Sequence, residues 1–151
     1  MLEDLRLIQR PTDAWDGFQN PFGAEAASAA RRFHRSVPEY APTPLVRLSA
    51  LARTLGVASV QVKDERPRFG RNAFKVLGGS YCIGRYIQSR FGLEHLSFEA
   101  LTRPALRAEM KDLTFVTATD GNHGRGIAWT ANRLGLKSVV YMPKGLSLLH
   151  I

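Results

Sequence analysis

The chain has 151 residues, enough for one domain with a hydrophobic core. Hydrophobic residues make up 44% of it and charged residues 23%, which excludes a low-complexity or collagen-like chain. The net charge of +8 suggests a nucleic-acid partner, but the 21 basic residues are scattered rather than gathered in a stripe interleaved with aromatic residues, so we expect no nucleic-acid binding.

The first half of the chain predicts short elements separated by proline and glycine. The amino-terminal segment ending in DAWDGFQNPFG indicates an irregular arm. The alanine-rich run over 24–35 predicts a helix, which ends before a proline. After the extended segment YAPTPLVRL, Ser49 fits the N-cap of a short helix that stops at Gly56. The alternation over 58–64 then predicts a strand.

The second half alternates helices and strands. A long helix is expected over 73–91, although Gly78 and Gly79 each cost about 1 kcal/mol relative to alanine, which indicates another reason for their presence. The elements expected after it are a short helix over 104–111, a strand over 113–119, a helix over 122–134 that stops at Gly135 and a strand over 137–142. This order predicts an α/β fold with an open, mostly parallel sheet and flanking helices.

Lys75 is the first candidate for chemistry. It lies in NAFKVLGGS, close to the expected start of a helix that follows a polar turn. There the positive end of the helix dipole disfavours a protonated amine, and only a neutral amine attacks an aldehyde. Lys75 is therefore a candidate Schiff-base nucleophile, although a lysine near a helix start is usually a solvated surface residue.

The second candidate is the loop TATDGNHG, between the strand over 113–119 and the next helix. Open α/β sheets bind ligands at this edge, where free N–H groups of a helix start favour a carboxylate. Gly121 and Gly124 are expected to let the backbone approach a ligand. Hydrogen-bonding side chains come from Thr119, Asp120, Asn122 and His123. The alternative, a helix cap and turn with His123 merely polar, fits the loop equally well.

Together the two motifs resemble those of the fold-type II pyridoxal-phosphate enzymes, the tryptophan synthase beta-like superfamily. RFGRNAFKVLGGSY and TATDGNHGRGIAW look most like diaminopropionate ammonia-lyases, whereas threonine dehydratases typically show a Ser-x-Lys motif and a serine before Gly-Asn-His. Pro-Thr-Pro-Leu at 42–45 and Lys-Asp-Glu at 63–65 fit the same family. The resemblance covers the N-terminal portion of such an enzyme, up to about Lys144.

The resemblance implies pyridoxal 5′-phosphate as cofactor. Lys75 would bind it as a Schiff base and then act as a base on the substrate α-proton. Asn122 would hydrogen-bond the hydroxyl oxygen of the cofactor ring. The cofactor would serve as an electron sink, so that an α-carbanion forms and the β-amino group of 2,3-diaminopropionate leaves as ammonia, with pyruvate and a second ammonia as final products.

The loop residues are implied to hold the amino-acid substrate. Thr119, Gly121 and His123 would bind its carboxylate. Asp120 would act as a second catalytic base or bind the additional amino group of the substrate, and the sequence leaves both roles open. Two alternatives remain: a threonine or serine dehydratase, and a non-catalytic fragment that associates with a partner. Full-length relatives are expected to be homodimers.

The resemblance also implies a domain division and a departure from the family. Residues from about 1 to 75 would form part of the large domain and those from about 76 to 145 most of the small domain, while 146–151 would be an atypical, truncated tail. The glycine-rich loop that cradles the cofactor phosphate in the family lies downstream. The fold-type II fold would thus be incomplete, and the chain alone would bind the cofactor poorly, show little lyase activity and expose apolar sheet surface.

Three further features of the sequence concern membrane association, cellular location and metal binding. No export signal or apolar run of about 18 residues is present, which predicts no membrane partner. The lone Cys82 cannot form an intramolecular disulfide, and a cytoplasmic protein is therefore expected. The four histidines are far apart and lack a cysteine partner or helical i, i+4 spacing, so no metal site is expected.

Overall fold

The computed structural model describes residues 22–119 and 121–144. Their helices are α1 (Ala24–Arg35), α2 (Ser49–Leu55), the 3-10 turn η2 (Arg68–Gly70), α3 (Lys75–Phe91), α4 (Phe98–Leu101), α5 (Pro104–Met110) and α6 (Asn122–Leu134). Their strands are β1 (Leu45–Arg47), β2 (Gln61–Lys63), β3 (Thr114–Ala118) and β4 (Lys137–Tyr141). Among these described residues, no helix is long and apolar enough to cross a membrane.

Glycine ends three of the helices. Gly56 after α2, Gly92 after α3 and Gly135 after α6 adopt left-handed conformations, with φ of 66°, 63° and 74°. This conformation carries little steric cost only for a residue without a Cβ, which is why the chain leaves the helix there. The helix ends predicted at Gly56 and Gly135 are confirmed.

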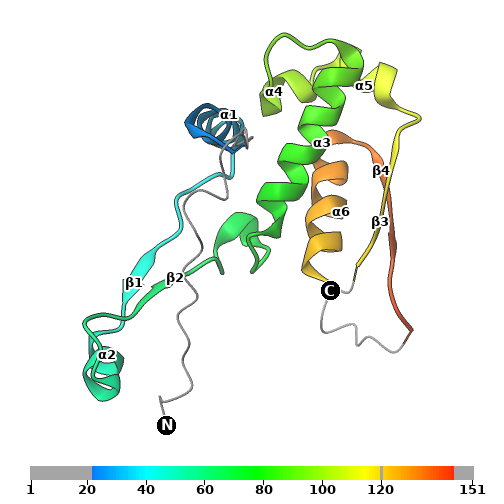
Figure 1. Ribbon diagram of the computed structural model, residues 1–151. Helices are drawn as coiled ribbons and strands as arrows, with labels where there is room; N and C mark the ends of the chain where they lie inside the picture. The colour runs from blue at the N-terminus through cyan, green and yellow to red at the C-terminus, as the bar shows by residue number, and fades with distance from the viewer. Residues whose placement is uncertain (1–21, 120, 145–151) are drawn as a thin grey trace, which may run out of the picture.

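The parallel sheet expected in the second half of the chain is confirmed. β3 and β4 pair in parallel, with Val116 opposite Val139, and α6 crosses between them on one face. Figure 1 shows β3 and β4 running together beside α6, while α3 lies along α6 on the side away from β4. This strand–helix–strand unit places the carboxyl ends of both strands at one edge of the sheet.

The strand predicted over 58–64 is shorter than expected and lies outside this sheet. Only Gln61–Lys63 is extended, and it pairs antiparallel with β1. The intervening segment folds back on itself, because Leu48 N–H donates to the Val60 carbonyl at 2.9 Å and continues the ladder. The result is a two-stranded arm that carries α2 away from the helical cluster (Figure 1).

The main core lies between α3, α6 and the short helices α4 and α5. Its buried apolar side chains are Phe33, Ile83, Ile87, Leu101, Leu106, Met110, Ile127, Ala131, Leu134 and Leu136. Gly79 and Gly84 let α3 approach its neighbours: a Cβ at Gly79 would lie 3.1 Å from Ile127, and one at Gly84 would lie 3.3 Å from Phe33. Gly78, by contrast, faces open space, so packing explains only one glycine of the predicted pair.

Candidate active site

The loop after β3 joins the sheet to the start of α6. Thr119 N–H donates to the Tyr141 carbonyl at 3.0 Å, which continues the parallel ladder one residue beyond β3. Thr119 Oγ1 accepts from the Gly121 N–H at 3.4 Å, and α6 begins at the next residue, Asn122. The helix start therefore stands at the carboxyl edge of the sheet, where the sequence predicts it.

Gly124 has a packing role that the sequence does not predict. A Cβ at this position would lie 2.6 Å from both Thr119 Cγ2 and Val140 Cγ1, so the glycine lets α6 rest on the two strands. Gly124 also lines the cavity beside this loop, so the prediction that it lets the backbone approach a ligand stays a prediction. Tight packing of helix on strand fixes the loop.

Lys75 is the first residue of α3, and its side chain is exposed. Gly126 brings α6 close to it: a Cβ there would lie 3.1 Å from Val76 N and 3.2 Å from the Lys75 carbonyl oxygen. Asn122, one helical turn before Gly126, is exposed as well. The amino ends of α3 and α6 thus lie at the same end of the helix pair (Figure 1), and Lys75 and Asn122 are the first residues of these two helices.

Two cavities flank the start of α6. One of about 420 Å³ is lined by Gly121, Gly124, Arg71, Arg125, Ala128, Trp129, Asn132, Val140 and Met142. The other, also of about 420 Å³, lies between α3 and β3 and is lined by His123 together with Cys82, Ile83, Tyr86, Leu113–Thr117 and Ile127. Gly121 thus lines one cavity and His123 the other, and their predicted binding of one carboxylate stays a prediction. Asp120 lies outside the described residues.

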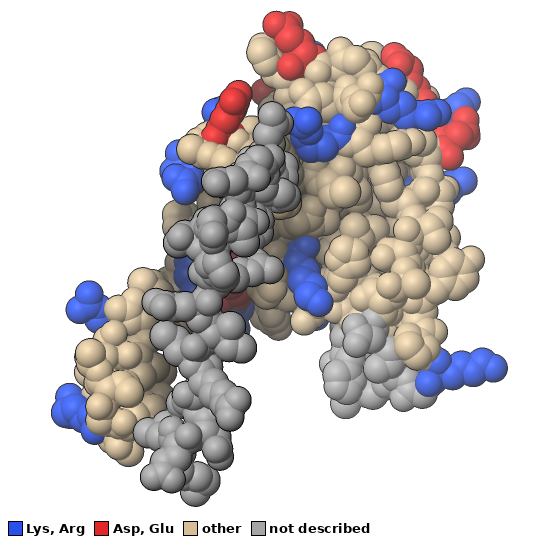
Figure 2. All heavy atoms as spheres, viewed as in Figure 1, with Lys and Arg blue, Asp and Glu red and all other residues tan. Residues whose placement is uncertain are grey.

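Two arginines that the motif analysis did not single out line the first cavity. Arg71 belongs to the turn before α3, and Arg125 lies in the first turn of α6. Arg125 belongs to the motif TATDGNHGRGIAW, so the sequence alone was sufficient to place it next to the loop. In the orientation of Figure 2, basic side chains stand at separate points of the surface rather than in one patch.

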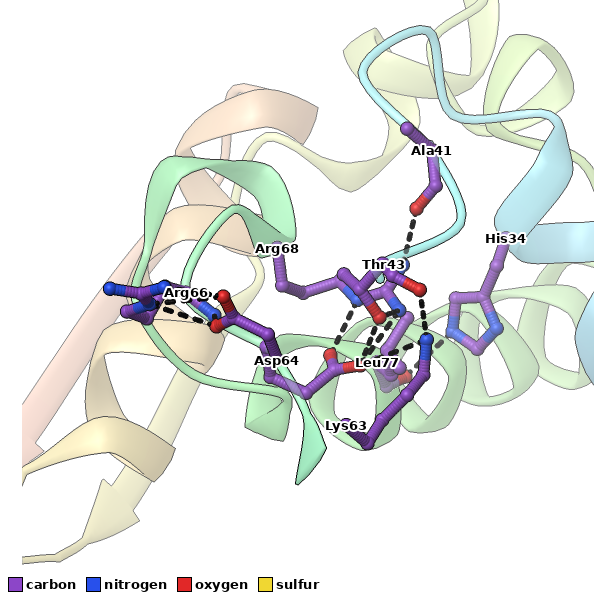
Figure 3. Close-up of polar contacts among 9 residues, drawn as sticks. His34, Ala41, Thr43, Lys63, Asp64, Arg66, Arg68 and Leu77 are labelled. Carbon is purple, nitrogen blue, oxygen red and sulfur yellow. Dashed lines mark hydrogen bonds and ion pairs between the residues drawn. The ribbon is translucent and has the colours of Figure 1, made fainter. Parts of the chain in front are cut away.

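Arg68 forms a buried polar cluster just before the lysine motif (Figure 3). Its guanidinium donates to Glu65 Oε2 at 2.8 Å, to Thr43 Oγ1 at 3.0 Å and to the Ala41 carbonyl at 2.8 Å. The hydrogen bond from Arg68 holds the pKa of Glu65 below its ordinary value, and the same bond raises the pKa of Arg68. The carboxylate and the guanidinium stay charged because they are paired with each other.

Motif analysis missed this cluster. The segment ERPRFGRN at 65–72 forms the polar turn that the sequence predicts before the lysine motif, yet Arg68 is only 6% exposed. A buried arginine carries no local sequence signal, since its partners Ala41 and Thr43 lie more than twenty residues earlier. The described residues place no group of three or more His, Cys, Asp or Glu side chains where it could hold a metal ion.

A family model described as pyridoxal-phosphate dependent enzyme matches residues 37–149. Among curated proteins, the chain is 56% identical over 120 residues to a diaminopropionate ammonia-lyase of Salmonella typhimurium, an alignment that covers 78% of the chain and 30% of that relative. It is 31% identical over 128 residues to the biosynthetic L-threonine dehydratase of the same organism, covering 82% of the chain and 20% of that protein.

The solved structures agree with this pattern. The fold superposes on holo diaminopropionate ammonia-lyase from Escherichia coli with a TM-score of 0.80 and 45% identity, covering 89% of this chain and 34% of that one. The chain therefore spans about a third of the length of these ammonia-lyases.

Proposed function

The chain belongs to the family of pyridoxal-phosphate dependent enzymes, and we propose that it carries the lysine-bearing part of an ammonia-lyase site for 2,3-diaminopropionate. One observation carries the proposal: Lys75 and Asn122 stand exposed at the adjoining amino ends of α3 and α6. In this proposal residues from about 1 to 75 belong to a large domain and those from about 76 to 145 to a small one.

The residues at this place fit pyridoxal phosphate. Lys75 offers an exposed primary amine to its aldehyde, and the Asn122 amide offers a donor to its ring oxygen. The N-cap positions of both helices, Phe74 and Gly121, make no side-chain capping hydrogen bond, so the first N–H groups of α6 can bind anionic oxygens. When bound, the cofactor supplies an electron sink for a carbanion.

The chain's own residues then bind the amino acid and move its proton. Lys75 Nζ takes the α-proton, and the Thr119 hydroxyl with the N–H groups of Gly121 and His123 holds the carboxylate. His123 lines the other cavity, and in this scheme it contributes its backbone N–H. Asp120 binds the second ammonium group of the substrate or acts as a second base.

The choice of substrate rests on two differences from the dehydratases. The chain is 56% identical to a diaminopropionate ammonia-lyase and 31% identical to a threonine dehydratase. It also has Asp120 where the dehydratase motif has serine. A carboxylate pairs with the ammonium group of diaminopropionate, whereas the hydroxyl group of threonine or serine offers it no charge. A cytoplasmic location fits this metabolic role.

The described residues leave the candidate site open to water. Lys75, Asn122 and the neighbouring Phe74 are all exposed, with 59% of the Phe74 side chain accessible. Elimination needs an enclosed site that excludes water and aligns the substrate. We therefore expect the 151-residue chain by itself to hold the cofactor weakly and to eliminate ammonia slowly.

A chimera tests the proposal. Residues of this chain replace the matched 120-residue segment of the Salmonella relative, which supplies the rest of the fold. We expect the chimera to release pyruvate from 2,3-diaminopropionate, a Lys75→Ala chimera to lose this activity, and a Lys111→Ala control to keep it. A folded chimera that produces 2-oxobutyrate from threonine faster than pyruvate from diaminopropionate supports the dehydratase instead. A folded, cofactor-loaded chimera inactive on both substrates contradicts the proposal.

A further inference from the structure

We propose that Arg68 is a positioning residue for Lys75, acting through the turn that connects them. The inference rests on the proposed role of Lys75 and adds a residue outside the lysine and asparagine motifs. Arg68 lies in the 3-10 turn η2, and Lys75 opens α3 seven residues later. Nothing in the proposed chemistry uses Arg68 directly, yet it is among the most buried charged groups of the described residues.

The Arg68 guanidinium ties together segments that are distant in sequence. It bridges Glu65, just after β2, to the extended segment at Ala41 and Thr43 that leads into β1. Lys63 donates to the Thr43 carbonyl and pairs with Glu65 at 3.9 Å, which closes the cluster. Figure 3 shows these groups converging on one point at the base of the arm.

Aromatic rings extend the cluster towards α6. The guanidinium carbon of Arg68 lies 5.5 Å from the centre of the Tyr40 ring and 6.0 Å from that of Phe69. The Phe69 ring lies in turn 5.0 Å from the Trp129 ring of α6. Arg68 therefore connects the base of the arm to the helix whose first residue is Asn122.

The connection to Lys75 is a strained turn. Phe69 and Asn72 have φ of 48° and 56°, and Gly70 between them has φ of 64°. Side chains with a Cβ rarely adopt this conformation, and it persists only where surrounding contacts enforce it. Those contacts come from Arg68 and the Phe69 ring on one side, and from the buried Ala73 and Val76 on the other.

The turn sets the direction in which α3 begins. Gly126 packs closely against this helix start: a Cβ added to it would lie 3.1 Å from Val76 N and 3.2 Å from the Lys75 carbonyl oxygen. The first turn of α3 therefore has little room to move. A turn released to ordinary backbone angles would rotate the first turn of α3 and move the Lys75 amine relative to Asn122. The Arg68 cluster prevents this by holding the turn from its amino end.

Amide hydrogen exchange on the full 151-residue chain tests the inference. Arg68→Met removes the guanidinium but leaves Glu65 partnered by Thr43 and Lys63. Arg68→Lys keeps a buried positive charge beside Glu65 and offers a second variant if the first does not fold. Arg66→Met is the matched control: Arg66 pairs with Asp64 at 2.6 Å, but its side chain is 82% exposed.

We expect Arg68→Met to speed exchange about tenfold at the hydrogen-bonded amides of Gly70, Arg71 and Leu77, with α6 unchanged. Arg68→Lys should show a smaller effect and Arg66→Met none. Unchanged exchange at these three amides in both Arg68 variants overturns the inference. Loss of protection spread evenly over α3 and α6 overturns it too, since that indicates general destabilisation.

Borohydride trapping of pyridoxal phosphate separates this inference from the proposed function. If Lys75 is labelled preferentially in the unmodified chain, Arg68→Met should remove the preference and Arg66→Met should keep it. Retained preference in Arg68→Met overturns the positioning role and leaves the proposed function intact. If Lys75 shows no preference in the unmodified chain, the same comparison is made in the chimera, and no preference there either means that the proposed function fails. The exchange rates still decide whether Arg68 fixes the turn.

Discussion

At the scale of single residues, the absence of a side chain at Gly124 determines how α6 rests on the sheet. Gly124→Ala places a methyl group 2.6 Å from Thr119 and Val140, so the helix or the strands must shift. We expect the free energy of unfolding to fall by about 1–3 kcal/mol, the usual cost of overpacking. Urea denaturation monitored by circular dichroism measures the change.

Gly78→Ala is the control for this substitution. Gly78 lies in α3 with open space around it, so an added methyl group meets no atom within 4 Å. Alanine has the higher helix propensity, and we expect unchanged or slightly increased stability, by up to about 1 kcal/mol. Equal destabilisation by Gly124→Ala and Gly78→Ala would show that the loss of stability does not come from the contacts of the added methyl group.

The sequence predicted some of these residues well and others poorly. Lys75 and Asn122 were assigned to helix starts because the motif and the helix pattern coincide, and the structure places both there. The packing role of Gly124 could not be predicted, because a glycine near a ligand and a glycine under a helix look alike in sequence. Arg68 was missed because its burial depends on partners far along the chain.

At the scale of elements, α1 is attached to α3 through a buried histidine. His34 Nε2 lies 2.8 Å from the Leu77 carbonyl, in the first turns of α3. Burial lowers the pKa of His34 below 6.5, so the folded state favours the neutral ring. The unfolded chain then binds the proton more readily, and stability should fall as the pH drops below 6.5 towards the folded-state pKa.

Unfolding curves at pH 7.5 and at successive steps down to pH 5 measure this dependence. His34→Gln keeps an amide donor for the Leu77 carbonyl but cannot titrate, so its stability should depend less on pH in this interval. His95→Gln is the control, because the His95 side chain is 86% exposed. A pH dependence identical in all three proteins contradicts a role for His34.

Element prediction succeeded where the pattern is local. Helices α1, α2, α3, α5 and α6 and the β3–α6–β4 unit follow from local sequence patterns, as the structure confirms, whereas the short helix α4 and the turn η2 were not predicted. The pairing of β2 could not be predicted from the sequence, because an alternating pattern predicts a strand but not the strand with which it pairs. Its antiparallel pairing with β1 depends on how the α2 segment folds back, which is a tertiary property.

At the scale of the whole molecule, one face of the β3–β4 sheet is apolar and exposed. Val116 is 61% accessible, Val139 40% and Tyr141 65%, and the first two lie opposite each other. The predicted exposure of apolar sheet surface is therefore confirmed for the described residues. Such a face favours association, because burying it removes apolar area from water.

Sedimentation velocity over a range of concentrations tests this consequence. We expect self-association that weakens in Val116→Thr/Val139→Thr, which keeps the β-branched shape but adds hydroxyl groups. Val62→Thr on the arm, 44% exposed in the original chain, is the control and should leave association unchanged. A monomer at every concentration in the unmodified chain contradicts the expectation.

The most direct test of the central claim is site-resolved trapping of pyridoxal phosphate on this chain. Borohydride fixes the cofactor wherever an amine holds it, and peptide mass spectrometry compares Lys75 with Lys63, Lys111, Lys137 and Lys144. If the joined helix starts form the cofactor site, Lys75 carries most of the label, and Asn122→Ala reduces its share. Equal labelling of all five lysines, unaffected by Asn122→Ala, contradicts the claim.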